Sequence, residues 1–442
     1  MSTELQQTEI GEFPSAWSIG RVDSAFDIQQ GKQVSKKNRD GEHQRPFLRT
    51  KNVFWNRLEL TDLDEMHFSE AEQTRLELQA NDLLVCEGGS IGRTALWNNE
   101  VDGCLYQNHL HRLRAKGDKA HPQFGVYWLW YAFDVANLYF GRGNVTTIPN
   151  LSQSKLAELP MALPPLPEQK KIAHILSTVQ RAIEAQERII QTTTELKKAL
   201  MHKLFTEGLR NEPQKQTEIG PVPESWATPT VESLCAIKAS AMSYSQLEKT
   251  TNVSNGVRVI GIKVSDMNLP GNEIEFRTAN LERQLPEKEA LKRTVPANSI
   301  VFPKRGAAIA TNKKRLTTGY TVLDPNLIAV MPTKAVNHRY LFHWFNTFDL
   351  KKITDPGPTP QLNKKDIAPL KFPMPSVEEQ EEIAAAIDTV EEKATLHSRK
   401  RDQLQDLFRT LLHELMTAKT RVGNIDLSSI NNPTLPEERN AL

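Results

Sequence analysis

The chain has 442 residues, 55 Lys and Arg against 54 Asp and Glu, a net charge of +1, and three cysteines. So few cysteines cannot staple a small secreted fold, and the first residues lack the basic and apolar pattern of a secretory signal. The most apolar segment, 124–140, is interrupted by Asp134 and Asn137 and is too short to span a membrane. We therefore expect a soluble cytoplasmic protein of about three domains.

The first 163 residues are expected to form a mixed α/β domain. Short runs with strand character, such as 82–86, are separated by Gly and Pro residues, which commonly mark turns. The region ends in a proline-rich segment, Leu163-Pro164-Pro165-Leu166-Pro167. This segment separates the first domain from the helical region after it.

A long helix is predicted within residues 164–211. The segment 168–205 contains neither Pro nor Gly, and its apolar residues recur largely at alternating spacings of four and three. The interface positions chosen here are Ile172, Val179 and Ile183. Such a stripe over four or more heptads is typical of a coiled coil, and about 38 residues would form a rod roughly 57 Å long.

The second half of the chain repeats the first. Gln7 to Gly11 recur as residues 216–220, and the Glu168-Gln169 pair recurs as Glu379-Gln380. The predicted order is a second domain at 212–374, a second long helix at 375–420 and a tail at 421–442. The interface positions on the second helix are Ile383, Ile387, Val390, Leu404 and Leu411.

A unit of about 210 residues has therefore been duplicated, which predicts an α+β fold with pseudo-two-fold symmetry. Two equal helices, each with a stripe that needs a partner, favour pairing with each other. The alternative is that each helix packs only on its own domain.

The sequence contains no recognisable catalytic motif. It has no phosphate-binding GxxxxGK[ST] loop, no HExxH motif and no Asn-Pro-Pro-Tyr-like tetrapeptide of amino-methyltransferases. The spacing of Cys86, Cys104, His109 and His111 matches no usual zinc pattern, so a structural role is favoured. We predict no catalytic residues, no metal site and no cofactor on this chain.

Basic residues gather in each half of the chain, and their clusters could neutralise phosphates or read guanine. Between residues 32 and 57, eight Lys and Arg face only two acids, although residues 1–160 have a net charge of −4. Residues 304–315 contain five basic residues and no acid. An ordinary solvated surface is the alternative, and for two clusters in a duplicated chain the two interpretations are about even.

Glycine-rich segments add further candidates, because glycine lets a backbone approach a phosphate closely. They lie at 88–93 and 305–308, and at 141–147 and 357–361 just before each proline segment. Tight turns are the alternative. The aromatic runs 127–131 and 340–345 could stack on bases, but their continuous apolar character favours core helices.

The proposed DNA-binding residues form one set per domain. In the first they are Lys32, Lys36, Lys37, Arg39, Arg49, Lys51, Arg93, Arg142 and Asn144. In the second they are Lys263, Lys304, Arg305, Lys313, Lys314, Arg315 and Gln361.

The doubled order of domain, proline segment and helix resembles the specificity (S) subunits of type I restriction-modification systems. The residues at 163–173, 200–208 and 216–226 carry the resemblance, which covers residues 7–420. The second copy departs from it at 375–377, where Pro-Ser-Val replaces Pro-Pro-Leu.

The resemblance implies a non-catalytic DNA reader for host defence and DNA methylation. Two target recognition domains, held by an antiparallel helix pair, would each read half of a split, asymmetric site in double-stranded DNA. The helices would set the half-site spacing and dock two modification (methyltransferase) subunits, which use S-adenosylmethionine. Restriction subunits, which use ATP and Mg²⁺, would complete the nuclease. Two alternatives are a stand-alone tandem DNA-binding regulator and an unrecognised nuclease, of which the nuclease is the less favoured.

Overall fold

A computed structural model describes residues 4–139, 150–354 and 360–422. The chain divides into two compact units. Unit 1 combines residues 1–186 with 399–442, and unit 2 comprises residues 187–398. Each unit therefore contains one mixed domain and one part of each long helix.

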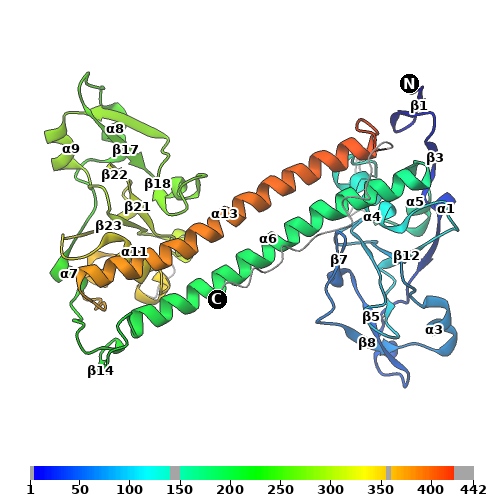
Figure 1. Cartoon of the computed structure of the whole chain (residues 1–442), viewed down its shortest axis with the longest axis horizontal. Helices are drawn as coiled ribbons and strands as arrows, with labels where there is room; N and C mark the ends of the chain where they lie inside the picture. The colour runs from blue at the N-terminus through cyan, green and yellow to red at the C-terminus, as the bar shows by residue number, and fades with distance from the viewer. Residues whose placement is uncertain (1–3, 140–149, 355–359, 423–442) are drawn as a thin grey trace, which may run out of the picture. The chain divides into compact units, whose positions relative to one another are not determined.

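Unit 1 is built on two main sheets (Figure 1). The four-stranded antiparallel sheet has the order β10 (Thr94–Leu96), β9 (Leu83–Cys86), β12 (Leu110–Ala115) and β4 (Phe26–Gln30). The three-stranded sheet has the order β11 (Leu105–Tyr106), β5 (Gln44–Leu48) and β8 (Asp64–His67), with β11 parallel to β5. Three strand pairs complete it: β1 (Leu5–Thr8) with β2 (Gly11–Pro14), β3 (Ser18–Arg21) with β13 (Pro160–Leu163), and β6 (Val53–Phe54) with β7 (Arg57–Leu58).

The shorter helices of unit 1 connect these strands. They are α1 (Val22–Ala25), α2 (Lys36–Arg39), α3 (Glu70–Leu76), α4 (Pro122–Trp130) and α5 (Gln153–Ala157), with a 3₁₀ turn at Thr50–Asn52. Helix α4 continues into a π-helical turn at Tyr131–Val135.

Unit 2 repeats this topology. Its larger sheet has the order β16 (Cys235–Lys238), β23 (Leu327–Pro332), β20 (Ile300–Pro303), β21 (Arg315–Thr317) and β18 (Glu275–Phe276). Its smaller sheet has the order β19 (Leu281–Leu285), β17 (Val257–Ile262) and β22 (Tyr320–Leu323). The hairpin β14 (Gln214–Thr217) to β15 (Gly220–Pro223) matches β1–β2. Apart from the added β18, the strand orders of the two main sheets agree between the units, so the duplication predicted from the sequence is confirmed.

The helices of unit 2 follow the same plan. They are α7 (Val231–Leu234), α8 (Tyr244–Lys249), α9 (Glu287–Arg293), α10 (Ala307–Ala310), α11 (His338–Phe345) and α12 (Lys364–Ile367), with 3₁₀ turns at Val264–Asn268 and Leu350–Ile353.

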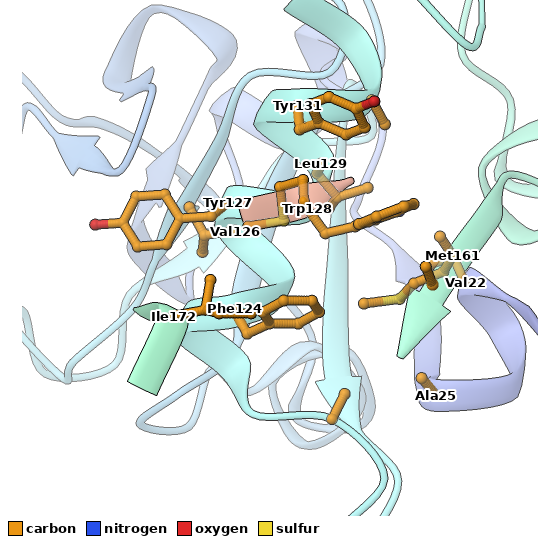
Figure 2. Close-up of a cluster of buried hydrophobic side chains, with 14 of the residues drawn as sticks. Val22, Ala25, Phe124, Val126, Tyr127, Trp128, Leu129, Tyr131, Met161 and Ile172 are labelled. Atoms are coloured by element: carbon orange, nitrogen blue, oxygen red, sulfur yellow. The ribbon is translucent and has the colours of Figure 1, made fainter. Parts of the chain in front are cut away.

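The aromatic runs form the cores of the two domains. Tyr127 and Trp128 on α4 are fully buried among apolar side chains from β13, α1 and the start of α6 (Figure 2). Tyr340 and Phe345 on α11 are equally buried. This confirms the interpretation of both runs as core helices, since buried rings cannot stack on a base.

The two long helices are α6 (Leu166–Thr206) and α13 (Val377–Met416), of 41 and 40 residues. Both lie within the segments predicted for them. In unit 1, Ile172 near the start of α6 shares a core with Leu412 near the end of α13. In unit 2, Leu204 near the end of α6 shares a core with Ile383 near the start of α13. The helices therefore run antiparallel within each unit.

The interface positions chosen from the sequence differ in burial. Ile172, Ile383 and Ile387 are buried, but in cores that also include side chains of the adjoining domain. Val179, Ile183 and Leu411 pack at the edge of the unit 1 core, and Val390 and Leu404 are half-buried. Leu412 and Met416, which the chosen register omitted, are more deeply buried than Leu411. Helix pairing and packing on the domain thus occur together at the helix ends.

The repeated Glu-Gln pair fastens each helix to its domain. The indole N–H of Trp17 donates to Glu168 Oε2 at 3.2 Å, and that of Trp226 donates to Glu379 at the same distance. The amide oxygen of Gln169 accepts the backbone N–H of His121, which precedes α4, at 2.7 Å. Gln380 accepts the backbone N–H of Asn337, which precedes α11, in the same way. These bonds explain why the residues recur.

The next contact along each helix differs between the units. In unit 1, the hydroxyl of Tyr127 contacts Ser177 and Gln180 of α6, both at 3.0 Å. In unit 2, the matching contacts are ionic. Asp388 of α13 accepts from the Nε of Arg339 at 3.0 Å and lies 2.6 Å from the Nε2 of His343. The same fold is therefore held to its helix by neutral bonds in one unit and by charged groups in the other.

Candidate DNA interface

The residue that follows β9 in the first domain and β20 in the second makes the same backbone hydrogen bonds in both. It is Glu87 after β9 and Lys304 after β20. The backbone N–H of Glu87 donates to His109 O at 2.9 Å, and its carbonyl accepts from the N–H of Leu151 at 2.9 Å. Lys304 makes the same two bonds, to Asn326 O at 2.6 Å and from the N–H of Leu362 at 2.9 Å. The strands that flank this position can therefore be aligned between the two domains, although the loop from 87 to 93 is shorter than the loop from 304 to 313.

Two further positions are basic in both domains. Arg49 and Lys263 each precede a 3₁₀ turn, where a side-chain oxygen of Asn52 or Asp266 accepts their backbone N–H. Arg93 and Lys313 occupy matching places before β10 and β21, as judged from the register with β9 and β20. Each domain therefore presents a basic residue on two corresponding loops.

The basic run of the first domain lies mostly at the surface. Lys36 and Arg39 on α2 are exposed, and Lys37 belongs to the same helix. Arg49 and Lys51 pair with acids: Arg49 with Asp64 at 2.5 Å and Lys51 with Asp62 at 2.7 Å. The hydrogen bond from Arg49 lowers the pKa of Asp64. Exposed ion pairs of this kind are worth little in water, so a phosphate could replace the acid.

Arg57 was not among the candidates, although it ends the same basic run. Its guanidinium lies 4.7 Å from the centre of the Phe54 ring, and that of Arg93 lies 5.3 Å from it. Neither guanidinium has an ion pair or hydrogen bond in the described residues. Two unpaired cations over one ring are suited to an anionic partner. The charge run itself was the signal for Arg57.

Lys32 is only 8% exposed and is committed to internal partners. Its ammonium donates to Glu72 at 2.6 Å and to the carbonyl of His67 at 2.7 Å. Lys32 is therefore not available to contact DNA, and we exclude it from the proposed interface.

Lys314 is also removed from the proposed interface. It is 1% exposed and donates to Asn312 Oδ1 at 2.8 Å and to the carbonyl of Phe348 at 3.0 Å. Burial lowers the pKa of its ammonium to about 8, because a low-dielectric environment disfavours charge.

Arg315 is half-buried, and burial lowers the pKa of its guanidinium as well. It lines a cavity of about 770 Å³ together with Lys314 and with Lys197 and Met201 of α6. Its guanidinium donates to the carbonyls of Lys314 and Met267. Because its hydrogen bonds go to the chain itself, Arg315 is a weak candidate for a DNA contact.

The remaining candidates of the second domain are accessible. The Lys263 ammonium lies 4.1 Å from the ring centre of Tyr244, and Lys313 hydrogen-bonds Asn268. Arg305 and Gln361 are both exposed and form an isolated β-bridge. The structure thus places Arg305 and Gly306 beside Pro360 and Gln361. Gly306 has φ +66°, so a tight turn requires a glycine there. Arg142 and Asn144 lie outside the described residues.

Cysteine and histidine side chains have structural environments. Cys86 and Cys104 are buried, and burial raises the pKa of each thiol to about 12. His111 is buried with its Nε2 2.9 Å from the carbonyl of Leu151. Within the described ranges, one group of side chains has the spacing of metal ligands: His343, Asp388 and Glu391. Ion pairs of these carboxylates with Arg339 and Lys197 already balance their charge.

None of the helices in the described ranges combines the length and apolar character that a membrane span requires.

This chain is similar over most of its length to proteins that are named as specificity subunits. It is 23% identical over 426 residues to a protein of Methanocaldococcus jannaschii named for the type I restriction enzyme MjaX specificity subunit, covering 95% of this chain and 97% of that one. It is 22% identical over 431 residues to the MjaVIII specificity subunit of the same organism, covering 93% and 95%. The EcoBI specificity subunit of Escherichia coli is 21% identical over 380 residues, covering 79% and 77%.

A solved structure shares the fold. The S subunit of a type I restriction-modification system from M. genitalium superimposes with a TM-score of 0.58 at 16% identity, covering 94% of this chain and 99% of that one. The family model described as "Type I restriction modification DNA specificity domain" matches residues 14–194 and again 223–406. Both halves of the duplication match it. The chain therefore belongs to the type I restriction modification DNA specificity domain family.

Proposed function

We propose that this chain is the sequence-recognition subunit of a type I restriction-modification complex. Each domain would read one half of a split, asymmetric DNA site, and the chain itself would carry out no chemistry. The observation that carries this proposal is the match of the DNA specificity family to both halves of the chain. Matching basic residues on corresponding loops, Arg49 with Lys263 and Arg93 with Lys313, supply the charge that DNA binding needs.

The partners we propose are two modification subunits and the restriction subunits, with S-adenosylmethionine, ATP and Mg²⁺ used by the partners. The long helices are the proposed docking elements and the proposed determinant of spacer length. Leu196 on α6 and Leu396 on α13 are more than half exposed, and exposed leucines on a helix suit a protein partner. Reading bases while a partner subunit flips and methylates one of them would explain a chain without a catalytic motif.

The test is co-expression of the chain with the products of its neighbouring genes, among which we look for a modification subunit. Native mass measurement gives the composition of the complex, and methylome sequencing of the host gives the target. A complex with two modification chains and one methylated split motif is expected. A chain that binds DNA tightly but ignores the modification subunit would instead be a tandem regulator. Turnover of DNA by the isolated chain with Mg²⁺ would favour a nuclease.

A further inference from the structure

The two domains carry opposite charges at a position whose backbone they hold in the same way. Residues 87 and 304 share both backbone hydrogen bonds, yet one is an acid and the other a base. Two positions close to this one keep their chemical type, since Arg93 corresponds to Lys313 and Asn150 to Gln361, whereas the residue that accepts the backbone N–H changes from His109 to Asn326. A charge inversion within a constant frame is the pattern expected of a residue that changes what is recognised.

In unit 1, Glu87 lies below the surface and organises its neighbours. Its Oε1 accepts the side-chain N–H of Asn150 at 3.2 Å, and its Oε2 accepts that of Gln30 at 3.3 Å. The Nδ1 of His109, a side chain 55% exposed, lies 3.4 Å from the same oxygen. The exposed Asn150 amide is therefore fixed with its NH₂ group toward Glu87 and its carbonyl oxygen left to accept.

In unit 2, Lys304 offers the opposite chemistry. Its side chain is half-buried and has no hydrogen bond or ion pair in the part of the chain that the structure describes. The adjacent Gln361 and Asn326 are exposed amides. An ammonium group has three donors and no acceptor, so a free ammonium here can only donate.

The base edges of DNA differ in the corresponding way. In the major groove, guanine presents two acceptors, whereas adenine and cytosine present an amino donor. We infer that residues 87 and 304 make the two half-sites different. Lys304 selects guanine, and Glu87, acting through Asn150, positions an acceptor for the amino group of adenine or cytosine. This inference rests on the proposed function and adds the residues and the class of base.

The experiment is selection from a randomised DNA duplex pool by the full-length chain at fixed salt, followed by sequencing of the bound fraction. Lys304→Glu should change one base of one half-site from guanine to adenine or cytosine, with a preference change of about tenfold or more. Glu87→Lys should introduce guanine at one base of the other half-site. Lys304→Arg should keep guanine, because Arg also donates to it.

Matched controls reverse charge elsewhere on the same domains. Lys288→Glu on α9 and Glu70→Lys on α3 alter exposed side chains by the same amount, and neither should change the motif. A motif that stays constant in Lys304→Glu, with affinity lowered equally for all sequences, would mean that Lys304 binds a phosphate and would overturn the inference for that domain. The same result for Glu87→Lys would overturn it for the other.

Failure of the proposed function gives a different result. In that case the wild-type chain enriches no split motif at all, and the variants are not needed. If Lys304→Glu does not fold, as judged by its circular dichroism melt, Lys304→Met removes the ammonium without adding charge. Loss of guanine preference in Lys304→Met supports the inference, and its retention contradicts the inference.

Discussion

Replacing Asp388 with Asn should destabilise unit 2 far more than the corresponding change destabilises unit 1. Burial alone would raise the pKa of Asp388, but hydrogen bonds from His343 and Arg339 outweigh it and bring the pKa from 3.8 to about 2. One pKa unit corresponds to about 1.4 kcal/mol, so the interaction stabilises the folded unit by about 2 kcal/mol at neutral pH. Asp388 is 25% exposed, and we expect a loss of about 2 to 3 kcal/mol.

The dependence on pH comes from the direction of the pKa change. A carboxyl whose folded pKa is lowered contributes its full stability above the unfolded pKa, and that stability is lost as the pH falls through the folded value. The difference between wild type and Asp388→Asn should therefore be complete at pH 7. It should fall to about half at pH 3 and to about a sixth at pH 2.

The matched control is Ser177→Ala, since Ser177 occupies on α6 the place that Asp388 occupies on α13. Tyr127 keeps its bond to Gln180 in this variant, so the cost should be below about 1 kcal/mol. Urea unfolding followed by hydrogen exchange and mass spectrometry reports the units separately, through peptides of α11 and α4. Equal losses in the two units, or an Asp388→Asn effect unchanged at pH 2, would refute the reasoning.

Three other predictions concern side chains that the structure places differently from their neighbours. Lys313→Glu should weaken DNA binding and reduce its salt dependence by about one counterion, which a salt titration of binding measures. Lys314→Glu should instead destabilise unit 2 by about 3 kcal/mol or more, because the atoms that its side chain contacts are oxygens. Thermal melts measure this loss. Burial lowers the pKa of Lys314 to about 8, so the unfolded chain binds more protons than the folded chain between pH 8 and 10.5. The free energy of unfolding of unit 2 should therefore increase by up to about 3 kcal/mol as the pH rises over that range. Lys314→Met should abolish this increase in urea titrations. Trp226→Phe should cost about 1 to 3 kcal/mol in urea unfolding, because it removes the indole donor of the buried Glu379 Oε2. Trp17→Phe should cost less, because Arg421 still donates to the Oε2 of Glu168; a larger loss for Trp17→Phe would contradict this.

The order of elements could be read from the sequence because it depends on local signals. The long helices lack Pro and Gly over almost 40 residues, and the repeated Glu168-Gln169 pair marks where each helix begins. The bonds of that pair to Trp17 and to the start of α4 could not be foreseen, because they join residues up to 151 positions apart. Leu412 is more deeply buried than Leu411, and the sequence could not distinguish them because two adjacent leucines fit the same spacing.

The candidate site was only partly predictable for a similar reason. A run of basic residues does not reveal which side chains point inward. Lys314 directly precedes β21 and faces the protein, whereas its neighbour Lys313 is accessible. The matching of Glu87 with Lys304 depends on strand pairings between distant segments, which the offsets of 209 and 211 residues seen elsewhere in the sequence do not give.

The segments of chain that form each unit determine the order in which the units can fold during synthesis. Unit 2 is one continuous stretch, 187–398, so all of its chain is available before the last 44 residues are made. Unit 1 takes core residues from both sides of it, including Phe408, Leu412 and Leu415, and Arg421 pairs with Glu168 at 2.9 Å. Domains generally fold as units while the chain emerges. Unit 1, whose domain is translated first, would therefore be the last to complete its fold. The apolar side chains that its domain buries against α13 would stay exposed to solvent until the end of α13 is made.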